Sequence, residues 1–292
     1  MTTRFGQRRS DLLRLWPFVP SAAVLAGLFF IPLAIVFVYS FWQVDPNLQV
    51  VPDWTLRNYQ RFFTNEAYLR TFGKTLVMAA LVTVVGIAIA IPYAWFLVRY
   101  TSRRTQRILL LLTIVPFWTS FLIRIYAWIG ILKNNGLINN ALLSLGLIDE
   151  PLAILHTPIA VYIGIVYAYL PFMVLPLYAN LVKHDSRLLE AASDLGASAW
   201  KAFLTITLPL SRAGIIAGSM LVMIPVVGEF VIPELLGGPD TLMIGRVLWQ
   251  EFFNNRDWPV ASAVAIVLLL LLIVPILIFH RYQSKELEAK LL

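Results

Sequence analysis

Long runs of apolar residues, separated by short polar segments, dominate the hydrophobic pattern of the chain. Each run has the roughly 20 residues that an α-helix needs to cross about 30 Å of hydrocarbon. In lipid, a helix of that length satisfies its own backbone hydrogen bonds. The pattern therefore predicts six transmembrane helices. They cover about residues 17–42, 75–98, 107–133, 157–182, 211–233 and 259–280.

The composition agrees with a membrane protein that has a single domain. Of the 292 residues, 59% are hydrophobic and 13% are charged, which is about half the charged share of a soluble domain. Length alone would suggest about two soluble domains, but six bundled helices account for the whole chain. We therefore expect residues 1–292 to form one all-α transmembrane domain.

Positive charges are distributed unequally between the two sides that these spans define. One side carries 15 lysines and arginines, in the N-terminal segment, two loops and the C-terminal tail, whereas the other side carries 7 and Arg124 lies within a span. Because cytoplasmic loops are enriched in Lys and Arg, both termini and the loop 183–210 are predicted to be cytoplasmic. The net charge of +7 is then an orientation signal and a contact with anionic membrane lipid. It does not indicate nucleic-acid binding.

Residue types that carry enzymatic or metal chemistry are missing or scattered. The chain has no cysteine, which excludes thiolate metal sites, and His156, His184 and His280 stand apart near the predicted membrane edges. No G-x-x-x-x-G-K-[ST] phosphate loop is present, so the chain cannot hold ATP by itself. We expect no catalytic residue, no metal site and no cofactor bound by this chain.

The predicted loop 183–210 contains the polar stretch EAASDLGASAWKAFLTITLP. Ser186 is suited to cap a short helix, and Gly196 is suited to end it because glycine adopts the left-handed conformation without strain. Ser198 caps a second short helix that Pro209 is expected to close. Two short helices at a glycine bend form a knob that fits a cleft on another protein. The alternative is an ordinary connection between helices that binds nothing.

The spacing within this loop favours the docking interpretation. Glu-Ala-Ala, three residues, Gly, nine residues, Ile, one residue and Leu-Pro are all in place, and this spacing resembles the signature loop of the membrane subunits of bacterial ATP-binding-cassette (ABC) importers. The resemblance implies a permease fold in which residues 186–209 form a coupling helix gripped by a separate ATPase subunit. The residues implied in this coupling are Glu190, Ala191, Ala192, Asp194, Gly196, Ile206, Leu208 and Pro209.

Segments outside the loop resemble one subgroup of these importer permeases. PFWTSFLIRIYAWIGILKNNG (116–136), ILHTPIAVYIGIVYAYLPFMVLP (154–176) and the stretch 226–263 are similar to the permease subunits of bacterial polyamine importers. The similarity covers about residues 75–280. It implies import of putrescine, with spermidine the next candidate, across the bacterial inner membrane. It also implies a second homologous permease, two ATPase copies that bind ATP and Mg, and a periplasmic polyamine-binding protein.

A path for a polyamine needs carboxylates or aromatic faces that attract ammonium groups. Glu229 is the acid placed inside a predicted span, about 25 Å of helix from the cytoplasmic end, and Pro225, Gly228 and Pro233 around it predict a kinked or broken helix. Arg124 is 17 residues from Arg107 on the third span, which runs in the same direction, so it reaches about the same depth. Glu229 therefore either faces the path or pairs with Arg124.

An aromatic stripe accompanies Arg124. Phe117, Phe121, Arg124 and Trp128 recur at helical spacing, which places them on one face of the predicted third span. Such a stripe either lines the substrate path or packs against another helix, and the sequence leaves both open.

Four acids lie in the outer segment 234–258. They would concentrate a dication at the mouth or dock a lobe of the periplasmic binding protein, and the resemblance favours docking. The acid that precedes Trp258 and Pro259 is also placed to cap the sixth span. These acids are Glu234, Asp240, Glu251 and Asp257.

Two other functions stay open at this stage. One is a permease of the same architecture for another solute, such as an anion or an iron complex, although the acids argue against an anion. The other is a stand-alone cation channel or secondary carrier. A carrier needs a complete path of its own, whereas the spans here contain one acid and one arginine, which looks like half of a path.

Overall fold

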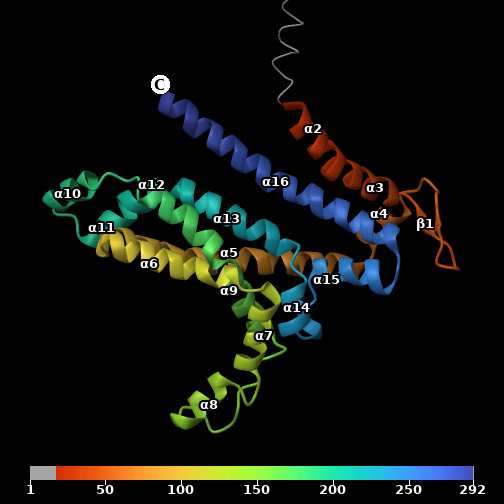
Figure 1. The fold of residues 1–292 in the computed structure, drawn as a ribbon, viewed down its shortest axis with the longest axis horizontal. Helices are drawn as coiled ribbons and strands as arrows, with labels where there is room; N and C mark the ends of the chain where they lie inside the picture. The colour runs from red at the N-terminus through yellow and green to blue at the C-terminus, as the bar shows by residue number, and fades with distance from the viewer. Residues whose placement is uncertain (1–17, 292) are drawn as a thin grey trace, which may run out of the picture. The chain divides into compact units, whose positions relative to one another are not determined.

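The computed structural model describes residues 18–291, and they are mostly helical (Figure 1). The start of the predicted first span at residue 17 lies outside the described residues. So do four arginines of the predicted cytoplasmic N-terminus, namely Arg4, Arg8, Arg9 and Arg14.

The elements follow one another along the chain with short connections. In order they are α2 (Val19–Leu25), the π-helical turn η2 (Ala26–Phe30), α3 (Ile31–Tyr39), β1 (Gln43–Val44), β2 (Val50–Val51), α4 (Arg57–Thr64), α5 (Glu66–Tyr100), α6 (Arg103–Ile114), the 3-10 turn η3 (Val115–Trp118), α7 (Phe121–Leu132), α8 (Leu137–Ser144), α9 (Pro158–Leu181), α10 (Arg187–Asp194), α11 (Ala199–Ala202), the π-helical turn η4 (Phe203–Thr207), α12 (Leu208–Leu210), α13 (Arg212–Val227), α14 (Val231–Leu236), the 3-10 turn η5 (Pro239–Thr241), α15 (Ile244–Trp249), the π-helical turn η6 (Gln250–Asn254) and α16 (Trp258–Leu291).

Four helical segments within residues 18–291 are long and apolar enough to cross a membrane. They match the predicted first, second, fourth and sixth spans, and they are Val19–Tyr39, Glu66–Tyr100, Pro158–Leu181 and Trp258–Leu277. Two bent helix pairs, Arg103–Trp118 with Phe121–Ser144 and Ala199–Leu210 with Arg212–Val227, bring the number to as many as six if each pair is one span. The all-α membrane fold is confirmed.

The prediction of one continuous helix over 107–133 is wrong. The helix breaks after Trp118, and the two parts of the pair are bent by 97°. Pro116 has no N–H to offer the helix, and its carbonyl accepts both the N–H (3.2 Å) and the hydroxyl (2.7 Å) of Thr119. That carbonyl therefore closes a turn. Because the chain changes direction there, the depth of Arg124 in the membrane does not follow from its 17 residues of separation from Arg107.

The described chain divides into two compact units. One contains residues 18–65 and 250–269, and the other contains 66–249 and 270–291. The helix α16 contributes residues to both, so the single permease domain stays a prediction.

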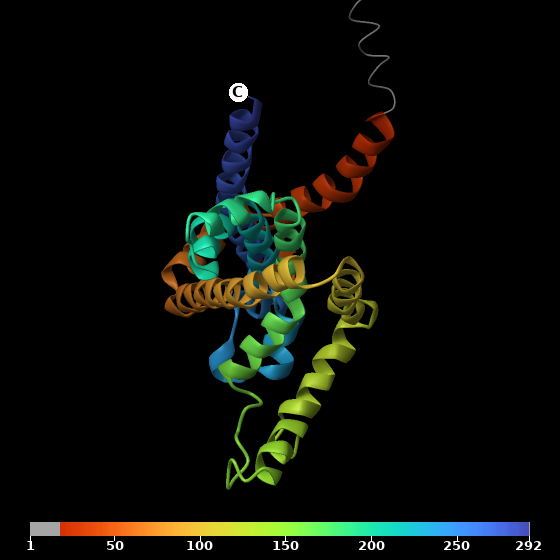
Figure 2. The same cartoon turned by 90° about the vertical axis from the view of Figure 1, so that its left-hand side faces the viewer.

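The larger unit has a core of three helices, α5, α9 and α13, which pack directly on one another. A Cβ added at Gly218 of α13 would lie 2.7 Å from Met173 Sδ and 3.1 Å from the Met173 carbonyl of α9. Only glycine therefore allows this approach of the two helices. Figure 2 shows α7 and α8 leaving this core as an arm. The helix α8 is short and spans Leu137–Ser144.

The smaller unit contains a hairpin that the sequence did not predict. Strands β1 and β2 pair antiparallel, and the buried Asn58 of α4 donates to the carbonyls of Ser40 (3.0 Å) and Trp42 (2.8 Å) beside them. Arg61 Nη1 of the same helix lies 3.2 Å from Asp257 Oδ2, an ion pair within this unit.

Candidate functional site: the coupling loop and the broken helix

The loop after α9 folds as the two short helices that its sequence predicts. Ser186, the predicted cap, makes no side-chain capping hydrogen bond. Instead, Asp185 Oδ1 accepts the N–H of Arg187 (3.0 Å) at the start of α10. Gly196 has φ +77°, and the N–H of Ala197 donates to the carbonyl of Ala192 (2.9 Å). This left-handed residue and its bond end α10 as glycine caps do, so the bend at Gly196 is confirmed.

The second helix begins at the predicted cap and runs slightly further than expected. Ser198 Oγ accepts the N–H of Lys201 (3.3 Å). The helix continues through α11, η4 and α12 to Leu210, one residue beyond Pro209, and is followed by a bend of 64° into α13. The N–H of Ser211 still donates to the Thr207 carbonyl (3.0 Å), so the helical bonding extends past Pro209. Pro209 therefore lies inside the last turn instead of after it.

The coupling loop presents apolar side chains that this chain does not cover. No residue of α10 is buried, and Leu188, Leu195 and Trp200 are 47%, 89% and 66% exposed. Glu190, Ala191, Asp194 and Gly196 are exposed, whereas Ala192, Ile206, Leu208 and Pro209 are half-buried. Large apolar side chains left exposed on a polar loop are available to a protein partner.

Substituting Gly196→Ala tests the bend. No atom lies within 4 Å of the added Cβ, so the cost is backbone strain alone, about 1–2 kcal/mol for an L-residue in the left-handed region. Gly146→Ala is the matched control, since Gly146 also has a positive φ (+66°) and open space but follows α8. Both variants should lose similar thermal stability, and Gly196→Ala alone should lower uptake. Equal uptake in the two would contradict a special role for the bend.

Glu229 lies in the break between α13 and α14, where the proline and glycine pattern predicts one. Its Oε1 accepts the N–H groups of Phe230 (3.1 Å), Val231 (2.9 Å) and Ile232 (3.2 Å), and its Oε2 accepts the hydroxyl of Tyr169 (2.5 Å). The side chain is 6% exposed. Four donors thus satisfy a buried carboxylate, which caps α14 and ties it to α9.

Arg124 does not pair with Glu229 within the described part of the chain. Its guanidinium carbon lies 4.7 Å from the centre of the Phe117 ring and 5.6 Å from that of Phe121, a cation–π arrangement. Its Nε is buried without a hydrogen-bond partner. The predicted stripe is divided by the break, since Phe117 belongs to η3, and Trp128 packs on Tyr167 at 5.4 Å instead.

Aromatic rings connect the two charges indirectly. The Phe117 and Phe172 rings meet edge to face at 5.2 Å, and Phe172 lies 6.1 Å from Tyr169, which holds Glu229. Tyr169 and Phe172 are not among the site residues that the sequence predicts. The only signal was a pair of aromatic residues within the apolar fourth span, 60 residues from Glu229 in the case of Tyr169.

Known proteins similar to this chain are importer permeases. Residues 82–288 match the family model described as "Binding-protein-dependent transport system inner membrane component". The chain belongs to this family of ABC importer permeases. It is 42% identical over 252 residues to the spermidine/putrescine transport system permease protein PotB of Escherichia coli K12, covering 86% of this chain and 91% of that protein. PotB of Haemophilus influenzae is 41% identical over 86% of this chain and 87% of its own length.

Solved structures show the same fold at low sequence identity. A chain of a bacterial ABC transporter that imports the acidic polysaccharide alginate gives a TM-score of 0.73 at 18% identity, covering 96% of this permease and 99% of that chain. A chain of the methionine transporter MetNI, in an inward-facing conformation, gives 0.53 at 18% identity, over 73% and 93%. By its family and its PotB relatives, this permease is a multi-pass inner-membrane subunit and is not itself an enzyme.

Three of the four outer acids of the permease already have partners. Glu234 forms an ion pair with Arg246 Nε, and the buried Glu251 accepts from Asn255 Nδ2 (2.8 Å). Asp257 pairs with Arg61 and accepts the N–H of Val260 (3.2 Å), which confirms it as the cap of α16. Asp240 is exposed and lines a hollow with Lys74. Whether these acids form a mouth or a docking surface stays a prediction.

Proposed function

We propose that this permease is a transmembrane subunit of an ATP-driven polyamine importer, with putrescine as the first cargo and spermidine as the next. The identity of 42% over 252 residues to a spermidine/putrescine permease carries this proposal. The cationic cargo also agrees with the aromatic cluster in the larger unit, since aromatic faces attract ammonium groups.

In this proposal α10 and α11 dock in a groove of a separate ATPase. Their uncovered leucines and tryptophan supply the apolar contact, and Glu190 supplies a charge that anchors it. ATP and Mg bind to two copies of that ATPase, and a second homologous permease completes the path. A periplasmic polyamine-binding protein delivers the cargo, as the alginate importer has been solved with a periplasmic protein. Both termini and α10 face the cytoplasm, in agreement with the lysine and arginine distribution.

The proposed path uses the aromatic residues and not the buried acid as its contact with cargo. The ring faces of Phe117 and Phe121 already hold a cation, the guanidinium of Arg124, so they are suited to hold an ammonium group when Arg124 moves aside. Trp128 extends this aromatic lining. Glu229 is occupied by four donors and maintains the break in the helix. Asp240, exposed within η5, attracts the dication at the mouth or contacts the binding protein.

Competition for uptake tests the cargo. Cells or proteoliposomes that contain the assembled importer should lose labelled-putrescine uptake when unlabelled putrescine or spermidine is added, and oxyanions such as sulfate should have no effect. Inhibition by oxyanions with none by diamines or triamines would instead identify a permease of the same architecture for another solute. Putrescine uptake by the purified chain without an ATPase would identify a stand-alone channel or carrier.

A further inference from the structure

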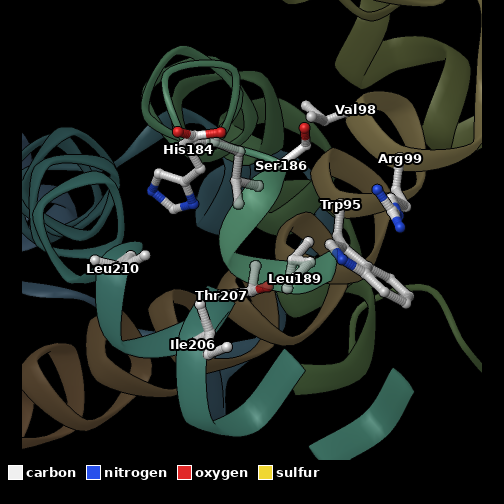
Figure 3. A pocket seen from close by; sticks show the side chains of 11 residues that line it. Trp95, Val98, Arg99, His184, Ser186, Leu189, Ile206, Thr207 and Leu210 are labelled. Atoms are coloured by element: carbon white, nitrogen blue, oxygen red, sulfur yellow. The ribbon is translucent and has the colours of Figure 1, made fainter. Parts of the chain in front are cut away.

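A small cavity lies at the root of the coupling loop, apart from the proposed path. Its volume is about 100 Å³, which exceeds the roughly 30 Å³ of one water molecule but leaves no room for an acyl chain. Trp95 and Arg99 of α5 lie on one side, and His184 and Leu210 lie on the other, with Leu189 and Thr207 between them (Figure 3). The cavity thus touches α5, α10 and α12, all within the larger unit.

One polar group in this cavity lacks the partner that a folded protein normally provides. Thr207 is 4% exposed, and its hydroxyl is buried without a hydrogen-bond partner. An unsatisfied buried hydroxyl costs free energy, so it points to a ligand that supplies an acceptor. Arg99 is exposed at the rim and forms none of the ion pairs among residues 18–291, so its guanidinium is available to the same ligand.

The charged groups around the cavity indicate which charges the ligand carries. Asp185 also lines it, and its Oδ1 is used by the N–H of Arg187. Burial lowers the pKa of His184 below its usual value, so the imidazole is neutral at pH 7 and adds no charge. The wall therefore carries one guanidinium and one carboxylate, which complements a zwitterion. The remaining lining is apolar, and Trp95 with Arg99 near the end of α5 is the residue pair typical of a membrane–water interface.

From these observations we propose that the cavity binds the headgroup of an aminophospholipid. The phosphate lies against Arg99 and the hydroxyl of Thr207, the ammonium lies against Asp185, and the acyl chains stay in the bilayer. A bound headgroup joins α5 to η4 and to Asp185 just before α10, and so braces α10. The site does not depend on which solute the permease carries.

Lipid binding to the full-length chain tests this site. Phosphatidylethanolamine or phosphatidylglycerol is titrated into phosphatidylcholine nanodiscs that contain the chain, and retained lipid is measured by native mass spectrometry. Arg99→Gln should weaken binding of both lipids about tenfold, the loss of a charge-assisted hydrogen bond. Thr207→Val should weaken both without loss of stability, since its hydroxyl has no partner. Asp185→Asn should abolish only the preference for phosphatidylethanolamine.

Arg104→Gln is the matched control, because Arg104 is an exposed arginine of the adjacent α6 that does not line the cavity. It should bind both lipids like the unchanged chain. Equal losses in Arg99→Gln and Arg104→Gln would overturn the site in favour of general attraction to lipid. Equally tight binding of glycerophosphoethanolamine or inorganic phosphate in detergent would overturn the assignment to a lipid. None of these measurements involves transport, so they can fail or succeed independently of the cargo.

Discussion

Replacing Glu190 with alanine is expected to lower ATP-driven uptake about tenfold, the effect of losing one hydrogen bond to a charged group at an interface. Glu190 is exposed on α10 and has no side-chain partner among the described residues. Removing it therefore breaks no contact within the chain. The loss should appear in transport and in cargo-stimulated ATP hydrolysis, measured in proteoliposomes, while membrane insertion and thermal stability stay unchanged.

The control for this prediction is Arg187→Ala. Arg187 is exposed at the first position of the same helix but lies outside the Glu-Ala-Ala motif, so its removal changes the charge of α10 and not the anchor. Uptake by this variant should stay near that of the unchanged importer. Normal uptake by Glu190→Ala would remove Glu190 from the coupling contact, and equal losses in both variants would reduce its role to general electrostatics.

The second large effect is expected at the break in the membrane helix. Glu229→Ala should destabilise the permease by about 4 kcal/mol or more, because each of the four donors left unsatisfied costs at least about 1 kcal/mol and the truncated side chain leaves a cavity. Three backbone N–H groups and the Tyr169 hydroxyl lose their acceptor together. Thermal unfolding of the purified chain in detergent measures this loss.

Glu229→Gln separates a helix cap from a cargo ligand. Glutamine keeps an oxygen for the N–H groups of α14, so the variant should lose only about 1 kcal/mol and should keep a near-normal KM for putrescine. The opposite outcome, normal stability with a strongly raised KM, would mean that the carboxylate charge meets the cargo. Tyr169→Phe should resemble Glu229→Gln, because it removes only the hydroxyl that donates to Glu229 Oε2.

Features set by local chemistry were predictable from the sequence. Helix length and hydropathy located four continuous membrane helices. In the coupling loop, Ser198 and Gly196 act on neighbours within five residues of the chain, through a cap and a left-handed bend, and both were predicted. The acid at the start of α16 was found for the same reason.

Features that depend on distant residues were not predictable. Nothing near Glu229 in the chain indicates that Tyr169, 60 residues earlier, donates to it. The third span was predicted as continuous because residues 107–133 are long and apolar overall, although Pro116 and the pair Thr119–Ser120 interrupt the run. The turn itself depends on how the Pro116 carbonyl is shared by two groups of Thr119. This one turn separates Phe117 from the helix that carries Arg124, and it invalidates the depth argument that paired Arg124 with Glu229.

In the proposed function, this chain moves polyamine only when a separate ATPase drives it through α10. The most direct test is labelled-putrescine uptake into proteoliposomes that contain the chain with its co-purifying permease, ATPase and binding protein, with and without ATP on the ATPase side. Uptake should require ATP and should disappear when the ATPase is omitted. It should fall about tenfold with Glu190→Ala. Uptake by the chain alone, or uptake indifferent to ATP, would contradict the proposed function.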